Sequence, residues 1–171
     1  MDVTQCKLGM GFSCTSDDES ALLLGNLLFG GSSNSKLFLN VREKLSLCYY
    51  ASSLYHRQKG LITVSSGVEF ADFQPAYEEI LSQLQALRQG QLEPWELDAA
   101  KGVLRSAYAA MEDSQGRLEN FWLGQAIEGR SDSPEDLSRE MEETSAERIF
   151  RAMETVKLDT VYYLERKEAR A

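Results

Sequence analysis

The chain has 171 residues, 43% hydrophobic and 26% charged, with 18 basic and 27 acidic side chains and a formal net charge of −9. Its length suits one domain with a sizeable core, and its composition is typical of a globular protein. The acidic excess argues against nonspecific binding to nucleic acid or to anionic membranes, because both depend on clustered cations.

The cysteine and histidine content excludes two common kinds of site. Cys6, Cys14 and Cys48 are odd in number and widely spaced, so they define no disulfide framework. With His56 as the single histidine and no CxxC pair, the sequence provides no Cys/His zinc site. No run approaches the ~18 apolar residues of a membrane span, and the N-terminus lacks a secretion-signal pattern. We therefore expect a cytoplasmic protein.

The N-terminal region predicts a strand and then a helix. Apolar residues alternate loosely over residues 3–14, which indicates a strand. The Asp17-Asp18 pair can cap a helix that runs through Leu28, and the Gly30-Gly31 pair is expected to stop it.

A shorter helix and a hairpin are expected next. Ser35 can cap the helix, whose apolar side would consist of Leu37, Phe38, Val41 and Leu45. Residues 48–55 are rich in β-formers, residues 58–60 form a turn, and residues 61–68 form the returning strand.

The pattern of the second half of the chain predicts mainly helices. An amphipathic helix is predicted over residues 73–87, closed by Gly90. A longer helical pattern covers residues 95–127, with a break at Gly116 or at the Asp113-Ser114 pair.

Two short helices and a last strand complete the pattern. The helices begin at Ser133-Pro134 and at Ala146, and residues 157–164 (KLDTVYYL) predict the strand. The resulting order, β-α-α-β-β-α-α-β, indicates an α+β fold in which helices pack on one face of an antiparallel β-sheet.

The glycine- and serine-rich segment over residues 30–36 (GGSSNSK) invites comparison with a phosphate-binding loop. It precedes a helix N-terminus, where free N–H groups can bind anions. However, the Walker pattern G-x-x-x-x-G-K-[ST] is not matched, because Leu37 follows Lys36, and the preceding segment is helical instead of a strand. A glycine helix end followed by a serine cap is the better interpretation.

Nucleophilic catalysis lacks the necessary groups. Cys48 or a serine would need a base, and His56 is the one histidine. On one extended strand these two residues would lie ~26 Å apart. His56 is better explained as an ordinary hairpin residue.

Recognition of an extended chain is the third possibility. Arg42 ends a predicted helix and Tyr49 begins the following strand. A guanidinium and a phenol at one corner can both donate to a carbonyl or carboxylate. Simpler roles, helix capping by Arg42 and core packing by Tyr49, remain equally open on the residues alone.

The sequence motifs around this corner resemble those of a known family. Residues 23–69 contain, in order, a Gly-Gly turn, the motifs S-x-L-F, R-E-K and L-x-Y, and a hairpin glycine. A second group of motifs covers residues 87–104 (LRQGQLEPWELDAAKGVL). Their order and spacing resemble the C-terminal, non-zinc-binding half-domain of M16 metallopeptidases (insulinase, pitrilysin, mitochondrial processing peptidase). Two positions depart from the pattern: Glu93 stands where Ser or Thr is usual, and Cys48 where glycine is commoner.

The resemblance implies a single domain over residues 1–171 that is one part of a longer two-domain chain. M16 members hold zinc in their first half through H-x-x-E-H and a later glutamate, and this sequence has no such motif. The implied cofactor arrangement is none in this chain and zinc in a partner half-domain. Alone, this chain is expected to be inactive.

The resemblance also assigns a role to the corner. An arginine and a tyrosine seven positions apart in the family reach toward the zinc half, and Arg42 and Tyr49 have that spacing. They are expected to bind substrate and stabilise the oxyanion from the far wall of a peptide chamber. The implied partners are a zinc-bearing N-terminal half-domain and a peptide substrate, with self-association of the isolated domain through an exposed apolar face. An inactive scaffolding or assembly subunit is the alternative.

Overall fold

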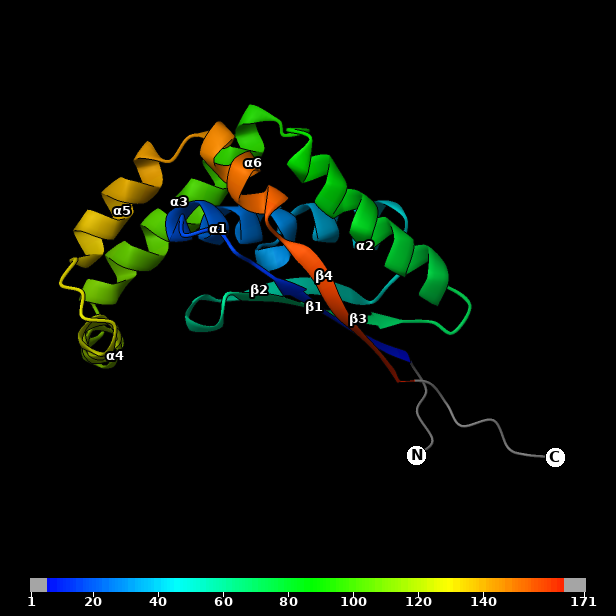
Figure 1. Ribbon diagram of the computed structural model, residues 1–171, viewed down its shortest axis with the longest axis horizontal. Coiled ribbons are helices and arrows are strands. Elements are labelled where there is room, and N and C mark those ends of the chain that lie inside the picture. The colour runs from blue at the N-terminus through cyan, green and yellow to red at the C-terminus, as the bar shows by residue number, and fades with distance from the viewer. Residues whose placement is uncertain (1–5, 165–171) are drawn as a thin grey trace.

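The computed structural model describes residues 6–164, which form one antiparallel sheet covered by helices on one face (Figure 1). The strands are β1 (Cys6–Ser13), β2 (Tyr50–His56), β3 (Leu61–Val68) and β4 (Lys157–Leu164). Their spatial order is β2-β3-β1-β4, and every neighbouring pair is antiparallel. The α+β fold with helices on one face is therefore confirmed.

Within residues 6–164, nine helical segments connect these strands. They are α1 (Glu19–Asn26), the π-helices η1 (Leu27–Gly31) and η2 (Leu37–Lys44), the 3-10 turn η3 (Arg57–Lys59), α2 (Phe73–Arg88), α3 (Pro94–Glu112), α4 (Gln115–Ile127), α5 (Pro134–Glu143) and α6 (Ala146–Glu154). The long helical pattern breaks at the Asp113-Ser114 pair, the second of the two predicted places.

The core lies between the sheet and the helical layer. Leu8, Met10 and Phe12 alternate along β1 and are at most 2% exposed, because they face the helices. The intervening Gly9 and Gly11 lie on the opposite face, over which Figure 1 shows no helix. β1 thus separates a packed side of the sheet from an open one.

Local sequence signals account for most element ends. The Asp18 carboxylate accepts a hydrogen bond from the Ala21 N–H at 3.1 Å and caps α1. Gly60 and Gly90 have φ of 55° and 74°, values that favour glycine, and end η3 and α2. The strand predicted over residues 3–14 covers Cys6–Ser13 in the structure, and its first residues lie outside the described range.

Two details of the helical segments between β1 and β2 differ from expectation. Leu45 does not join the buried side of this helix; it is 45% exposed, because η2 ends at Lys44 and the chain turns outward there. Gly30 and Gly31 end the helical run as predicted, but as the last residues of a π-turn that continues α1. Among residues 6–164, none of the helices combines the length and apolar character needed to cross a lipid bilayer.

Candidate functional site

The corner between η2 and β2 places the predicted binding residues. The Ser35 hydroxyl accepts from the Phe38 N–H at 3.3 Å, so the predicted serine cap begins this helix. At the other end, the Leu45 N–H donates to the Asn40 carbonyl at 3.1 Å, an i→i+5 bond. Ser46 then takes φ of 52°, and the Tyr49 N–H joins the sheet by donating to the Gly67 carbonyl at 2.8 Å. The corner is therefore fixed by backbone bonds on both sides.

Arg42 presents its guanidinium at the surface. Its side chain is 41% exposed, and its Nε lies 3.6 Å from the Glu43 carboxylate. The guanidinium carbon lies 4.8 Å from the centre of the Phe38 ring, within the range of a cation–π contact. Both contacts come from the same helix, so they hold the side chain in place without burying its charge.

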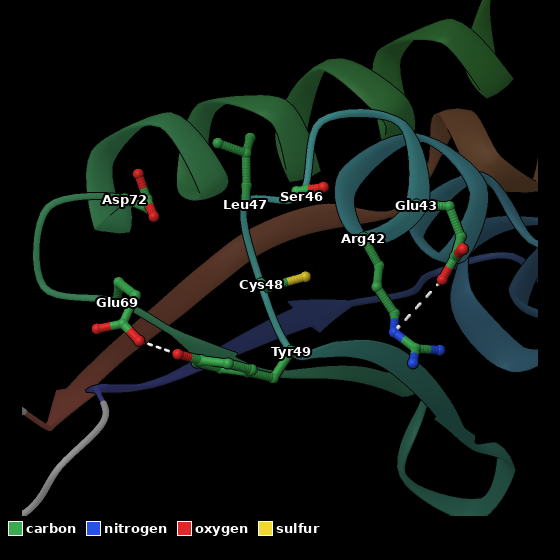
Figure 2. Close-up of a pocket in the computed structure, with 8 residues that line it drawn as sticks. All are labelled: Arg42, Glu43, Ser46, Leu47, Cys48, Tyr49, Glu69 and Asp72. Carbon is green, nitrogen blue, oxygen red and sulfur yellow. Dashed lines mark hydrogen bonds and ion pairs between the residues drawn. The ribbon is translucent and has the colours of Figure 1, made fainter.

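Tyr49 is also exposed, at 51%. Its hydroxyl donates to the Glu69 carboxylate, and Figure 2 shows the ring directed toward Glu69 and away from the Arg42 guanidinium. The two predicted residues line the same pocket, but their donor groups do not converge on one point in this arrangement.

The pocket around them has a volume of about 430 Å³ and is open to solvent (Figure 2). Its lining comes from three segments: the end of η2, the turn before β2 and the connection from β3 to α2. The lining residues are Arg42, Glu43, Ser46, Leu47, Cys48, Tyr49, Glu69 and Asp72. One guanidinium therefore shares the pocket with three carboxylates.

Sequence reasoning did not assign Glu69 and Asp72 to this site. Both lie on the turn between β3 and α2, where the Asp72 N–H donates to the Glu69 carbonyl at 3.1 Å. They lie 20 or more positions beyond Tyr49, and only the return of β3 alongside β2 brings them back. A hairpin register placing Gly67 opposite Tyr50 was the one signal that could have located them.

Cys48 and His56 do not form a catalytic pair. Burial raises the pKa of the Cys48 thiol, although a hydrogen bond with Ser66 and the charge of Arg42 oppose the shift. The thiol therefore stays protonated at neutral pH. His56 lies at the far end of β2, where its Nε2 is 3.0 Å from the Thr63 hydroxyl across the hairpin. This matches the prediction of an ordinary hairpin residue.

The GGSSNSK segment supports the corner through close packing and an ion pair. A Cβ on Gly30 would lie 2.7 Å from the Leu37 side chain and 2.8 Å from the Ser53 backbone nitrogen, so glycine permits this close packing. The Lys36 ammonium lies 3.2 Å from the Glu96 carboxylate on α3, and both side chains are less than 10% exposed. A buried ion pair therefore ties the start of η2 to α3.

Glu96 also satisfies the altered cap before α3. Its carboxylate accepts from the Glu93 N–H at 2.8 Å, so the helix start is capped although Glu93 replaces the usual Ser or Thr. Within residues 6–164, no group of three or more His, Cys, Asp and Glu side chains is placed to hold a metal ion.

Comparison with known proteins places the chain in a family. Residues 1–104 match the model of the peptidase M16 inactive domain. The chain is 39% identical over 171 residues to a Bacillus subtilis protein named "Probable inactive metalloprotease YmfF", covering 98% of this chain and 40% of that protein. A second B. subtilis protein, "Uncharacterized zinc protease YmxG", is 24% identical over 75% of this chain and 32% of its own length. The chain thus spans two fifths or less of these relatives.

Solved structures of other proteins share the fold of this chain. A conserved protein from Enterococcus faecalis has a TM-score of 0.91 at 27% identity, over all of this chain and 41% of that chain. A peptidase M16 inactive domain from Pseudomonas fluorescens has a TM-score of 0.80 at 20% identity, over 95% of this chain and 41% of that one. The predicted family is confirmed: the chain belongs to the M16 peptidase family and is a domain of its inactive, C-terminal type.

Proposed function

We propose that this domain is the non-zinc half of an M16-type peptidase, and that its Arg42–Tyr49 pocket binds the main chain of a peptide facing a zinc-bearing half. The observation that carries the proposal is that both side chains line one solvent-open pocket at a corner fixed by backbone hydrogen bonds. A domain of this kind supplies no zinc and has no peptidase activity alone.

The chemistry of the two donors suits this role. A guanidinium and a phenol can each donate to a peptide carbonyl, and to the oxyanion that replaces it during hydrolysis. Because the Tyr49 hydroxyl is bonded to Glu69, a ligand must take over that bond. Glu69 thus acts as a resting acceptor that holds the ring at the pocket until a carbonyl replaces it.

Peptide hydrolysis in a reconstituted enzyme tests the proposal. The domain is mixed with a zinc-bearing M16 half, and cleavage of a peptide pool is followed with zinc present. Arg42→Ala and Tyr49→Phe should each lower kcat by roughly 10²–10³, the usual cost of losing one oxyanion donor. Arg139→Ala removes an exposed guanidinium that pairs with Asp136 on α5, and it should leave turnover unchanged. Near-normal turnover in both pocket variants would rule out the role assigned to Arg42 and Tyr49.

A scaffolding role is the second candidate, in which the domain pairs with another half but binds no substrate. It is favoured by the name of the B. subtilis relative as an inactive metalloprotease and by the three carboxylates in the pocket. Association of the two halves with no hydrolysis in any mixture would select this candidate over the first.

A further inference from the structure

A second cavity lies where the turn of the β2–β3 hairpin meets α1, α3 and α5. It is bounded by Leu23, Tyr55, Tyr108 and Met141, among others, and has a volume of about 100 Å³. Figure 1 shows the hairpin turn at one end of the sheet, while the connection from β3 to α2, which lines the Arg42–Tyr49 pocket, lies at the other end. This hairpin-end cavity is therefore separate from the peptide pocket.

The charged side chains at the hairpin-end cavity are already paired with one another. A single carboxylate oxygen of Glu19 lies 2.9 Å from the Arg57 Nε and 2.6 Å from the Arg130 guanidinium. Arg57 also pairs with Glu128. Arg130 also pairs with Asp132, at 2.9 Å. Two guanidiniums are thus balanced by three carboxylates, so the cluster has no excess positive charge with which to attract an anion.

Two phenols at the cavity differ from the charged groups, because they have no protein acceptor. Neither the Tyr55 nor the Tyr108 hydroxyl makes a hydrogen bond to any of residues 6–164. Burial raises the pKa of Tyr55 to about 12, with a contribution from the charge of Glu19, and burial likewise raises the pKa of Tyr108. The Arg57 charge opposes both shifts, so both hydroxyls lie near the same guanidinium. Two protonated donors therefore share one cavity and can donate to a ligand.

Apolar side chains make up much of the remaining wall. Leu137 and Met141 on α5 are 6% and 4% exposed, and Leu23 on α1 is half-buried. Ser20 also lines the cavity, but its hydroxyl already donates to the Glu140 carboxylate. The volume is smaller than the roughly 150 Å³ of a cavity that takes up benzene, so an occupant must be compact. A fitting ligand has a small aliphatic body for this wall and an acceptor for the phenols.

We propose that the hairpin-end cavity binds a compact neutral carbonyl compound, namely a short branched amide or ketone. Its carbonyl oxygen accepts from the Tyr55 and Tyr108 hydroxyls, since a carbonyl has two lone pairs, and its aliphatic body lies against the apolar wall. A carboxylate of the same size meets the negative charge of Glu19, and an ammonium offers the phenols no acceptor. This site is independent of the proposed peptide pocket.

Titration of the chain with isobutyramide, followed by two-dimensional amide NMR, tests the proposal. A Kd on the order of 1 mM is expected for a ligand of about six heavy atoms, and the shifting amides should belong to α1, α5 and the end of β2. Tyr55→Phe and Tyr108→Phe each remove one donor and keep the ring, so Kd should rise by about three- to tenfold. Tyr162→Phe removes a phenol that is 59% exposed on the open face of the sheet, and it should bind like the wild type.

Two charged probes with the same aliphatic body complete the design. Isobutyrate and isobutylammonium should each bind at least about tenfold more weakly than isobutyramide, because a charge is costly to place in this cavity. Tighter binding of isobutyrate would show that Arg57 and Arg130 recognise the ligand, which overturns the proposal. An unchanged Kd in both cavity variants, or shifts that do not saturate, overturns it as well.

A larger probe distinguishes the source of the ligand. N-acetylvaline methylamide presents the same branched body and carbonyl within a peptide unit. If it binds as well as isobutyramide, with the same loss in Tyr55→Phe, the carbonyl group of a peptide residue is the natural occupant. Binding of isobutyramide alone identifies a free small molecule. Either result supports the proposed class, whereas binding of neither probe contradicts it.

Discussion

The corner that carries Arg42 and Tyr49 contrasts with the residues that support it, which are Gly30, Lys36, Leu37 and Glu96. These four residues, here called the support, are buried and closely packed. At the corner, both ligand-binding candidates are about half exposed. The difference teaches that rigidity is supplied by the support, while the donors themselves remain available to a ligand. Substitutions in the support should therefore change stability far more than substitutions at the corner.

The largest effect is expected from Lys36→Met. It leaves the Glu96 carboxylate buried without its cation, which should lower the free energy of unfolding by about 3–5 kcal/mol. Urea unfolding followed by circular dichroism measures the loss. The double variant Lys36→Met/Glu96→Met removes both charges and should recover part of it, because it also loses the Glu96 cap on the Glu93 N–H. A single variant as stable as the wild type would show that this pair does not hold η2.

Gly30→Ala should come next. Its new Cβ would lie 2.8 Å from the Ser53 backbone nitrogen, which cannot move freely within β2, so a loss of about 2 kcal/mol is expected. Gly11→Ala is the matched control, because its Cβ would meet Thr160 at an ordinary 3.8 Å. Equal melting temperatures for the two variants would contradict the close packing assigned to the support.

Asp18→Asn tests the comparison through the pH dependence of stability. Burial opposes ionisation of Asp18, but hydrogen bonds from Arg148 and from the Ala21 N–H outweigh it and lower the carboxyl pKa. A lowered pKa in the folded state stabilises the fold at pH values above the ordinary aspartate pKa of about 4, and this contribution is lost as the pH falls below it. Asp18→Asn should cost about 1 kcal/mol at pH 7 and progressively less as the pH is lowered from about 4 to 2. An unchanged difference between these pH values would exclude this linkage.

Ser46→Gly should have the smallest effect, and of opposite sign. Ser46 has a left-handed φ of 52°, so glycine should relieve strain and raise stability by less than about 1 kcal/mol. Ser46→Ala keeps a Cβ and should be neutral. If Ser46→Gly lowers the Tm, the serine side chain itself stabilises the turn between the two donors.

Sequence patterns located most elements because each depends on local chemistry. Examples are the Asp18 cap, the glycines at positions 60 and 90 and the hairpin strand Leu61–Val68. The Arg42–Tyr49 corner was also local, since one helix end and one strand start define it. A spacing of three or four apolar residues cannot separate a π-helix from an α-helix, so the form of η2 was not predictable.

Long-range contacts were not predictable from these patterns. The partner of Lys36 lies 60 positions away on α3, and Glu69 enters the pocket through hairpin register. A charged residue after a serine cap is normally solvated, so nothing local indicated that Lys36 is buried. The exposure of Leu123 and Ile127 on α4 was likewise not predictable, because the apolar content of this helix alone resembles that of a core helix.

The i→i+5 bonding of η2 makes the site sensitive to chain length. Each hydrogen bond of this helix spans one residue more than an α-helical bond, so deletion of a single residue such as Leu39 would allow ordinary α-helical bonding. The helical residues after the deletion, Arg42 among them, would then rotate by about 100° relative to those before it, while the Tyr49 N–H stays bonded to the Gly67 carbonyl in the sheet. Arg42 would then point in another direction relative to Tyr49, with every side chain of the pocket still encoded. A one-residue change in length can therefore separate the two donors without any substitution.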